Sequence, residues 1–260
     1  MSTGVNAILA RPRIITIAAL GILIAAAWAW ILGGAAMGPG APPDEATMGG
    51  MVMEPSASWS IDRLAIVFSM WWTMMVAMML PSAAPTILLY ERVARNVPQG
   101  RTPAVAGFLC GYLLAWGLFS GIATLMQFWL TRWALIAPLT MASQSTRLSG
   151  MILIAAGAYQ LSPLKSACLR HCQNPAGFLS RHYSDGTFGA LRMGALHGAV
   201  CVGCCWLLMA LLFVAGVMNV VWIALLTILV ASEKLLPLDR VISVIVGLAC
   251  LIGGGLMLWS

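Results

Sequence analysis

Long apolar segments dominate this chain and exclude an ordinary water-soluble fold. Apolar residues make up 61% of the 260 residues and charged residues only 8%, whereas about a quarter of a soluble domain is charged. A helix needs about 20 mostly apolar residues to cross the roughly 30 Å hydrocarbon core of a bilayer. The candidate segments are 14–32, 64–90, 104–130, 148–161 with part of the segment before it, 190–214, 218–231 and 241–259. We therefore expect an all-α fold, a polytopic bundle of about seven transmembrane helices.

The basic residues favour one orientation of this bundle in the membrane. With seven spans, most Lys and Arg residues fall in loops on the side of the N-terminus. This larger group is Arg11, Arg13, Arg92, Arg95, Arg101, Lys165, Arg170, Arg181, Arg192, Lys234 and Arg240, and the smaller group is Arg63, Arg132 and Arg147. Because loops rich in Lys and Arg stay in the cytoplasm, we expect the N-terminus inside and the C-terminus outside. The net charge of +6 then reflects topology, and no nucleic-acid partner is expected.

The chain divides into an anchor, a linker and a larger helical domain. The segment 1–34 fits a signal peptide or an N-terminal transmembrane anchor, and its long apolar run favours the uncleaved anchor. The linker 35–60 is rich in Gly, Pro and Met and is expected outside. Soft thioether ligands in it either collect Cu(I) or Ag(I) or belong to a plain flexible linker. These ligands are Met37, Met48, Met51 and Met53. The segment 61–260 forms a six-helix membrane domain.

Soft candidate ligands share one face of the predicted fifth span. His197, Cys201, Cys204 and Cys205 stand at i, i+4, i+7 and i+8, which places them on one helical stripe. Met209 extends the stripe by a turn. Ionisable groups at bilayer depth mark functional sites, and thiolates, thioethers and imidazoles bind soft metals. Free cysteines also pack as small hydrophobes, so the stripe predicts either metal or redox chemistry or a packing face.

A second row of sulfur atoms lies in the predicted second span. Met74 and Met78 stand one helical turn apart, and Met79 lies alongside. Pro81 and Pro85 follow, and each removes a backbone hydrogen bond, so freed carbonyl oxygens need partners or a polar cavity. Methionine rows also serve as packing surfaces. The row therefore predicts packing or an ion site, and contact with the fifth span would join both rows into one site.

Further candidate ligands lie in the segment 163–186, which is polar and basic and is expected to be a cytoplasmic loop. Cys168 and Cys172 are four residues apart, and His171 is adjacent to the second cysteine. Thiols stay reduced in the cytoplasm. The pair is therefore expected to bind metal rather than to form a disulfide.

Small and charged residues elsewhere are expected to have structural roles. Two GxxxG motifs, 107–111 and 117–121, predict helix faces that pack closely. Glu233 and Lys234 end the predicted sixth span. We expect them to be interfacial anchors, because charged side chains near helix ends reach the polar headgroups.

The sequence resembles a family of bacterial integral membrane proteins known only as predicted metal-binding membrane proteins. The matching motifs are WWTMMVAMMLP (71–81), SPLKSACLRHCQNP (162–175), GAVCVGCCWLLM (198–209) and EK (233–234). The resemblance covers roughly 60–257 and implies a multi-pass protein of the bacterial cytoplasmic membrane. The site residues it implies are Met78, Met79, Lys165, Cys168, Cys172, Cys201, Cys204, Cys205, Met209, Glu233 and Lys234. His171 and His197 are candidates by their positions alone.

These features favour a membrane protein that binds a soft transition metal, most simply copper, for transport or for delivery to a membrane enzyme. Sulfur ligands favour Cu(I), and the spans lack the carboxylates that hard ions need. Another soft metal ion is an alternative cofactor. Besides the lipid bilayer, the expected partner is a membrane enzyme or a metallochaperone.

Two other functions fit the same residues. Cys201 and Cys204 form a Cys-x-x-Cys pair, as in membrane thiol–disulfide oxidoreductases. The glycine faces would also suit an accessory subunit of a larger membrane enzyme complex. We assign no catalytic residue, because no arrangement for nucleophilic hydrolysis is recognisable.

Overall fold

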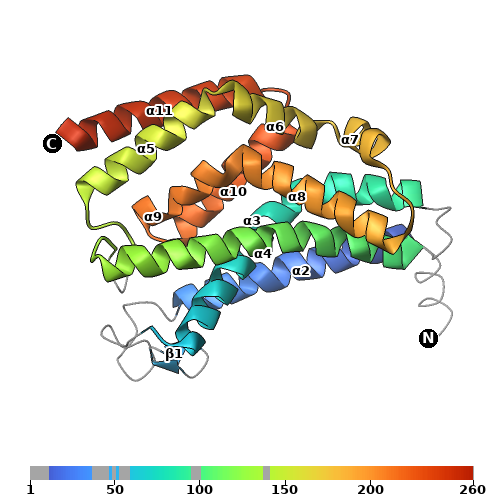
Figure 1. Ribbon diagram of the computed structural model, residues 1–260, viewed down its shortest axis with the longest axis horizontal. Helices are drawn as coiled ribbons and strands as arrows, with labels where there is room; N and C mark the ends of the chain where they lie inside the picture. The colour runs from blue at the N-terminus through green and yellow to red at the C-terminus, as the bar shows by residue number, and fades with distance from the viewer. Residues whose placement is uncertain are drawn as a thin grey trace.

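The computed structural model describes residues 12–36, 47–48, 51–52, 59–94, 101–136 and 141–259, most of which are helical (Figure 1). The helices are α2 (Pro12–Ala36), α3 (Ile61–Val93), α4 (Arg101–Arg132), α5 (Thr146–Gln160), α6 (Pro163–Gln173), α7 (Pro175–His182), α8 (Gly186–Ala210), α9 (Leu212–Ala215), α10 (Val220–Leu235) and α11 (Asp239–Trp259). A two-residue hairpin pairs β1 (Thr47–Met48) with β2 (Met51–Val52). The predicted all-α class is confirmed.

Five helical segments are long and apolar enough to cross a membrane: Arg13–Gly34, Ile61–Val93, Thr102–Arg132, Gly186–Ala215 and Asp239–Trp259. A sixth candidate is the pair α5 and α6, which passes the same test together but bends by 63° between its two helices. Helix α10 has 16 residues, fewer than the about 20 that a straight span needs. The chain is therefore a multi-pass helical membrane protein.

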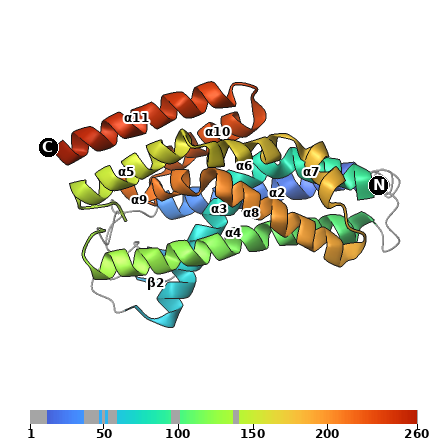
Figure 2. The same ribbon diagram turned by 45° about the horizontal axis from the view of Figure 1, so that its top comes forward.

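The helices lie roughly alongside one another rather than in separate layers (Figures 1 and 2). Both views show α4 beside α8 and α11 beside α5, in agreement with the close backbone contacts of these two pairs. Helix α7 lies toward one end of the bundle, and the C-terminus lies at the other. Helices α3, α6, α8 and α10 meet in its interior.

The prediction that 163–186 is a loop is wrong, because two short helices, α6 and α7, occupy most of it. The side chain of Ser162 accepts a hydrogen bond from the Lys165 backbone N–H at 3.2 Å, and Pro163 begins α6. Asn174 ends α6 and caps α7 in the same way, ahead of Pro175. A polar cap followed by proline is a strong helix start, and these signals outweigh the polar composition.

Glycines allow α4 and α8 to pack with their backbones in contact. A Cβ atom at Gly194 would lie 2.7 Å from the Phe108 carbonyl carbon, and one at Gly198 would lie 2.6 Å from the Ala115 Cβ. Gly111 faces the α8 backbone in the same way. The motif 107–111 is therefore confirmed as a close-packing face. The motif 117–121 is not, because nothing lies within 4 Å of a Cβ at Gly121.

A buried ionic network joins the helices that flank the α5–α6 bend. Lys165 on α6 is 1% exposed, and its Nζ lies 2.6 Å from Oε1 of Glu233 on α10. Gln160 and Ser243 donate to the same carboxylate oxygen, each at 2.9 Å. Lys165 also donates to Gln160 Oε1. Four helices, α5, α6, α10 and α11, are thus fixed to one carboxylate.

The expectation that Glu233 and Lys234 are interfacial anchors is wrong. Glu233 is 2% exposed and Lys234 is 7% exposed. Both lie in the last turn of α10, where neighbouring helices cover them. A charged group in an apolar interior must be paired or hydrogen-bonded, and each of these two residues has such partners.

We predict that Glu233→Gln lowers the free energy of unfolding in detergent by about 3–5 kcal/mol, because removal of one partner leaves a buried charge uncompensated. The double variant Lys165→Met/Glu233→Leu removes both charges and should recover most of that loss. Denaturant titrations followed by circular dichroism measure both values. Equal stability of wild type and Glu233→Gln would show that the pair does not hold these helices together.

Candidate metal centre

Helix α8 carries a buried stripe of soft side chains, as its sequence predicts. Cys201, Cys204, Cys205 and Met209 are each at most 2% exposed, and His197 is 3% exposed. The seven cysteines are all free thiols. The shared burial confirms that these residues face the interior of the bundle rather than lipid.

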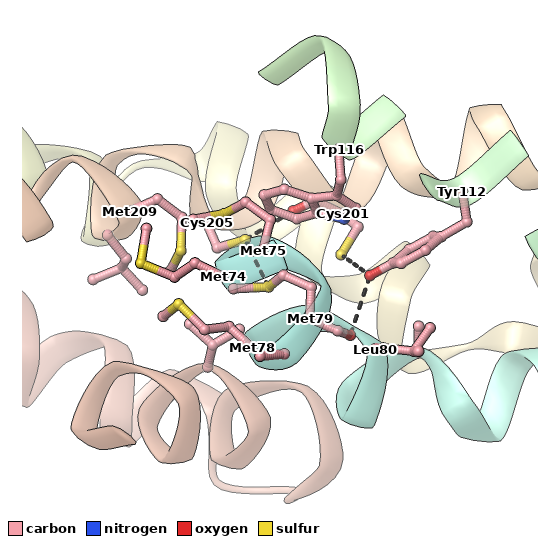
Figure 3. Close-up of a cluster of buried hydrophobic side chains, with 14 of the residues drawn as sticks. Met74, Met75, Met78, Met79, Leu80, Tyr112, Trp116, Cys201, Cys205 and Met209 are labelled. Atoms are coloured by element: carbon pink, nitrogen blue, oxygen red, sulfur yellow. Dashed lines mark hydrogen bonds between the residues drawn. The ribbon is translucent and has the colours of Figure 1, made fainter. Parts of the chain in front are cut away.

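Cys201 contacts two polar groups from other helices, and Figure 3 shows one of them, the Tyr112 hydroxyl. Lys234 on α10 donates to the Cys201 sulfur over 2.9 Å. The hydroxyl of Tyr112 on α4 lies 3.2 Å from the same sulfur and also donates to the Met79 carbonyl oxygen. An ammonium and a hydroxyl at these distances compensate the negative charge of a thiolate, which is the form of cysteine that binds metals.

Sulfur atoms from three helices meet next to Cys201. The sulfur of Cys205 lies 3.9 Å from the Met79 sulfur on α3. The sulfur of Cys204 lies 4.0 Å from the Cys172 sulfur on α6. Both α8 thiols also donate to the Cys201 carbonyl oxygen at 3.0 Å, which holds them on the same side of the helix. We call Cys172, Cys201, Cys204, Cys205 and Met79 the sulfur cluster.

The methionine row of α3 lies against this cluster. Met74, Met78 and Met79 are fully buried or nearly so, and Figure 3 shows them turned toward Cys205 and Met209 of α8. The two rows predicted on the second and fifth spans therefore do meet. Near Pro81, the Met79 carbonyl oxygen accepts hydrogen bonds from Tyr112 and Ser82. Side-chain hydroxyl groups thus donate to a backbone carbonyl in the proline-containing part of α3.

Three ligands were predicted in the cytoplasmic segment. Cys168 and Cys172 face α8, whereas His171 does not. Cys172 contacts Cys204, and a Cβ atom built on Gly203 would lie 3.3 Å from the Cys168 sulfur. His171 is exposed, and its Nδ1 lies 2.9 Å from the Ala167 carbonyl oxygen. Helix α6 packs on α8, so Cys172 lies beside the α8 thiols.

His197 lies one helical turn before Cys201 in a pocket of aromatic rings. Its ring centre is 5.2 Å from that of Phe178, 5.9 Å from that of Tyr112 and 6.1 Å from that of Phe108. Within the part of the chain that the structure describes, its Nδ1 has no hydrogen-bond partner. The imidazole therefore keeps an unused nitrogen close to the cluster.

Two polar residues of the centre were missed from the sequence. Tyr112 contacts Cys201, and Ser82 contacts Lys234 at 3.4 Å. The signal available was a polar hydroxyl inside an otherwise apolar span, which marks a functional position only weakly. The predicted ligands Met37 and Met53 lie outside the described residues, and of Met48 and Met51 only the backbone is described.

The sulfur cluster fits a soft ion by its donors and by its spacing. Metal–thiolate bonds are about 2.3 Å long, so two sulfurs that share one trigonally coordinated ion lie about 4 Å apart. The sulfur pairs are separated by 3.9 Å and 4.0 Å. In the described residues no three His, Cys, Asp or Glu side chains form a metal-binding group. Soft ions also bind thioether sulfur, which the Met79 side chain supplies beside Cys205.

Comparison with known sequences agrees with this donor set. The PpoB2 family, described as copper chaperone, matches residues 68–257, a range that includes every member of the sulfur cluster. No curated protein and no solved structure gives a significant match. With most of its length matched, the chain belongs to the PpoB2 copper chaperone family.

Proposed function

We propose that this protein carries Cu(I) within the membrane and delivers it to a membrane enzyme or to a metallochaperone. The observation that carries the proposal is that two α8 thiols each approach a sulfur of another helix: Cys204 lies 4.0 Å from Cys172 of α6, and Cys205 lies 3.9 Å from Met79 of α3. Soft sulfur donors select Cu(I) over hard ions. The carboxylate of Glu233, the residue before Lys234, is already paired with Lys165.

The sulfur cluster has distinct parts in this proposal. Cys201, Cys204 and Cys205 hold the ion from α8, while Cys172 and Met79 complete the site from the neighbouring helices. A further set of side chains takes over the ion as it moves: Met74, Met78, Cys168, His197 and Met209. Exchange between thiolate and thioether ligands suits a carrier, because weakly held ligands allow the ion to leave.

Lys165 and Glu233 position this site without contacting the ion. Their pair fixes α6 against α10, and α6 carries Cys172 to Cys204. The exposed His171 is the least suited of the predicted ligands.

We also infer a seven-span topology in the bacterial cytoplasmic membrane. This count takes α5 with α6 as one bent span and includes α10. The distribution of basic residues then supports a cytoplasmic N-terminus and an external C-terminus.

This topology predicts the behaviour of reporter fusions. Alkaline phosphatase, which is active only outside the cytoplasm, should be active when fused after Trp259 and inactive when fused after Ser184, between α7 and α8. The measurement is the ratio of enzyme activity to fusion-protein level. Activity at the second site and none at the first would reverse the orientation.

Substitution of the α8 thiols should remove copper from the protein. We expect Cys201→Ser/Cys204→Ser/Cys205→Ser to lose most of the copper that wild type retains after reconstitution with Cu(I), because serine is a poor ligand for soft ions. Cys110→Ser is the matched control, since Cys110 is exposed on α4. Elemental analysis of both purified variants gives the copper content. Equal copper in the triple variant and the control would assign these cysteines to packing.

Loss of the protein should affect copper enzymes mainly when copper is scarce. In a deletion strain we expect the activity of a membrane or exported copper oxidase to fall at low copper and to recover when copper is added. The comparison is oxidase activity against oxidase protein level in both media. Unchanged oxidase activity at low copper would contradict copper delivery.

A separate assay addresses the alternative function. Thiol redox cycling by the purified, metal-free protein would favour a thiol–disulfide oxidoreductase.

A further inference from the structure

A buried ammonium group lies inside the sulfur cluster. Lys234 is 7% exposed, and its Nζ lies 2.9 Å from the Cys201 sulfur, 3.4 Å from Ser82 Oγ and 3.9 Å from the Met79 sulfur. Two of these three neighbours belong to the cluster. The positive charge is therefore part of the environment of any ion held there.

No carboxylate neutralises this charge among the described contacts of Lys234. Its neighbour in sequence, Glu233, accepts from Lys165 at 2.6 Å and from Gln160 and Ser243 at 2.9 Å. The groups that do contact Lys234 are a thiol, a thioether and a hydroxyl. The charge of Lys234 is thus balanced only by negative charge that develops on the cluster.

Sulfur ligands by themselves do not separate monovalent from divalent soft ions. Thiolates bind Cu(I), and they also bind Zn(II) in many structural sites. Net charge does separate them. Cys204 and Cys205 donate S–H hydrogen bonds and are therefore neutral thiols. With two of the four cluster cysteines bound as thiolates and the other two neutral, a site that holds a monovalent ion carries one negative charge, which the ammonium matches. The same site with a divalent ion is neutral and leaves the buried ammonium uncompensated, which is unfavourable in an apolar interior.

We propose that Lys234 makes the sulfur cluster selective for monovalent soft cations, Cu(I) and Ag(I), over divalent ones such as Cd(II) and Zn(II). This inference rests on the proposed function, because it assumes that the cluster holds an ion. Lys234 acts through charge and does not ligate the metal. Its contact with Cys201 orients the thiol on the side of α8 where Cys205 and Met79 meet.

The test compares metal affinities of full-length protein in detergent. The variants are Lys234→Met and Lys234→Gln, which remove the charge, and Lys234→Arg, which keeps it. Competition with chromophoric chelators gives the dissociation constants for Ag(I) and Cd(II). Two neutral variants are used so that a folding defect in one does not decide the result.

We expect the ratio of Ag(I) to Cd(II) affinity to fall at least tenfold in both neutral variants, mainly because Cd(II) binds more tightly. The ratio should stay within about threefold of wild type in Lys234→Arg. An unchanged ratio in the neutral variants would overturn the inference, and so would an equal fall in Lys234→Arg. If wild type binds neither ion, the proposed function itself fails.

Discussion

The contact between the Lys234 ammonium and the Cys201 sulfur places a positive charge in the apolar interior, and the surrounding helices must supply polar partners for it. A lysine this deep in an apolar bundle is tolerated only where polar partners surround it, and Ser82 and Cys201 fill that need. The same requirement explains why Glu233, one residue earlier, is held by its own set of donors. Two adjacent charges on α10 thus face different networks and keep separate roles.

The bend between α5 and α6 is what converts scattered cysteines into one cluster. A straight span would carry Cys172 past the bundle, whereas the 63° change of direction brings α6 against α8. The buried pair of Lys165 and Glu233 holds the second half of the bend in place. On the opposite side, the glycine contacts of α4 with α8 bring Tyr112 within reach of Cys201.

Sequence reasoning predicted the features that depend on composition and local periodicity. The all-α membrane fold follows from apolar run length, and the buried face of α8 follows from the spacing of His197, Cys201 and Cys205. Sequence reasoning gave wrong predictions for segments whose structure or burial depends on contacts with other helices. Polar composition suggested a loop at 163–186, although capping signals at Ser162 and Asn174 were present. Burial of Glu233 and Lys234 at a helix end depends on neighbouring helices that no single segment reveals.

The central claim is that sulfur atoms from three helices share one Cu(I) ion, and the coordination of that ion is the most direct test. X-ray absorption at the copper edge, recorded on reconstituted full-length protein, reports oxidation state, ligand type and bond length together. The account predicts Cu(I) with sulfur ligands at about 2.3 Å and a weakened sulfur signal in Cys201→Ser/Cys204→Ser/Cys205→Ser. A first shell made of oxygen and nitrogen, unchanged in that variant, would contradict it.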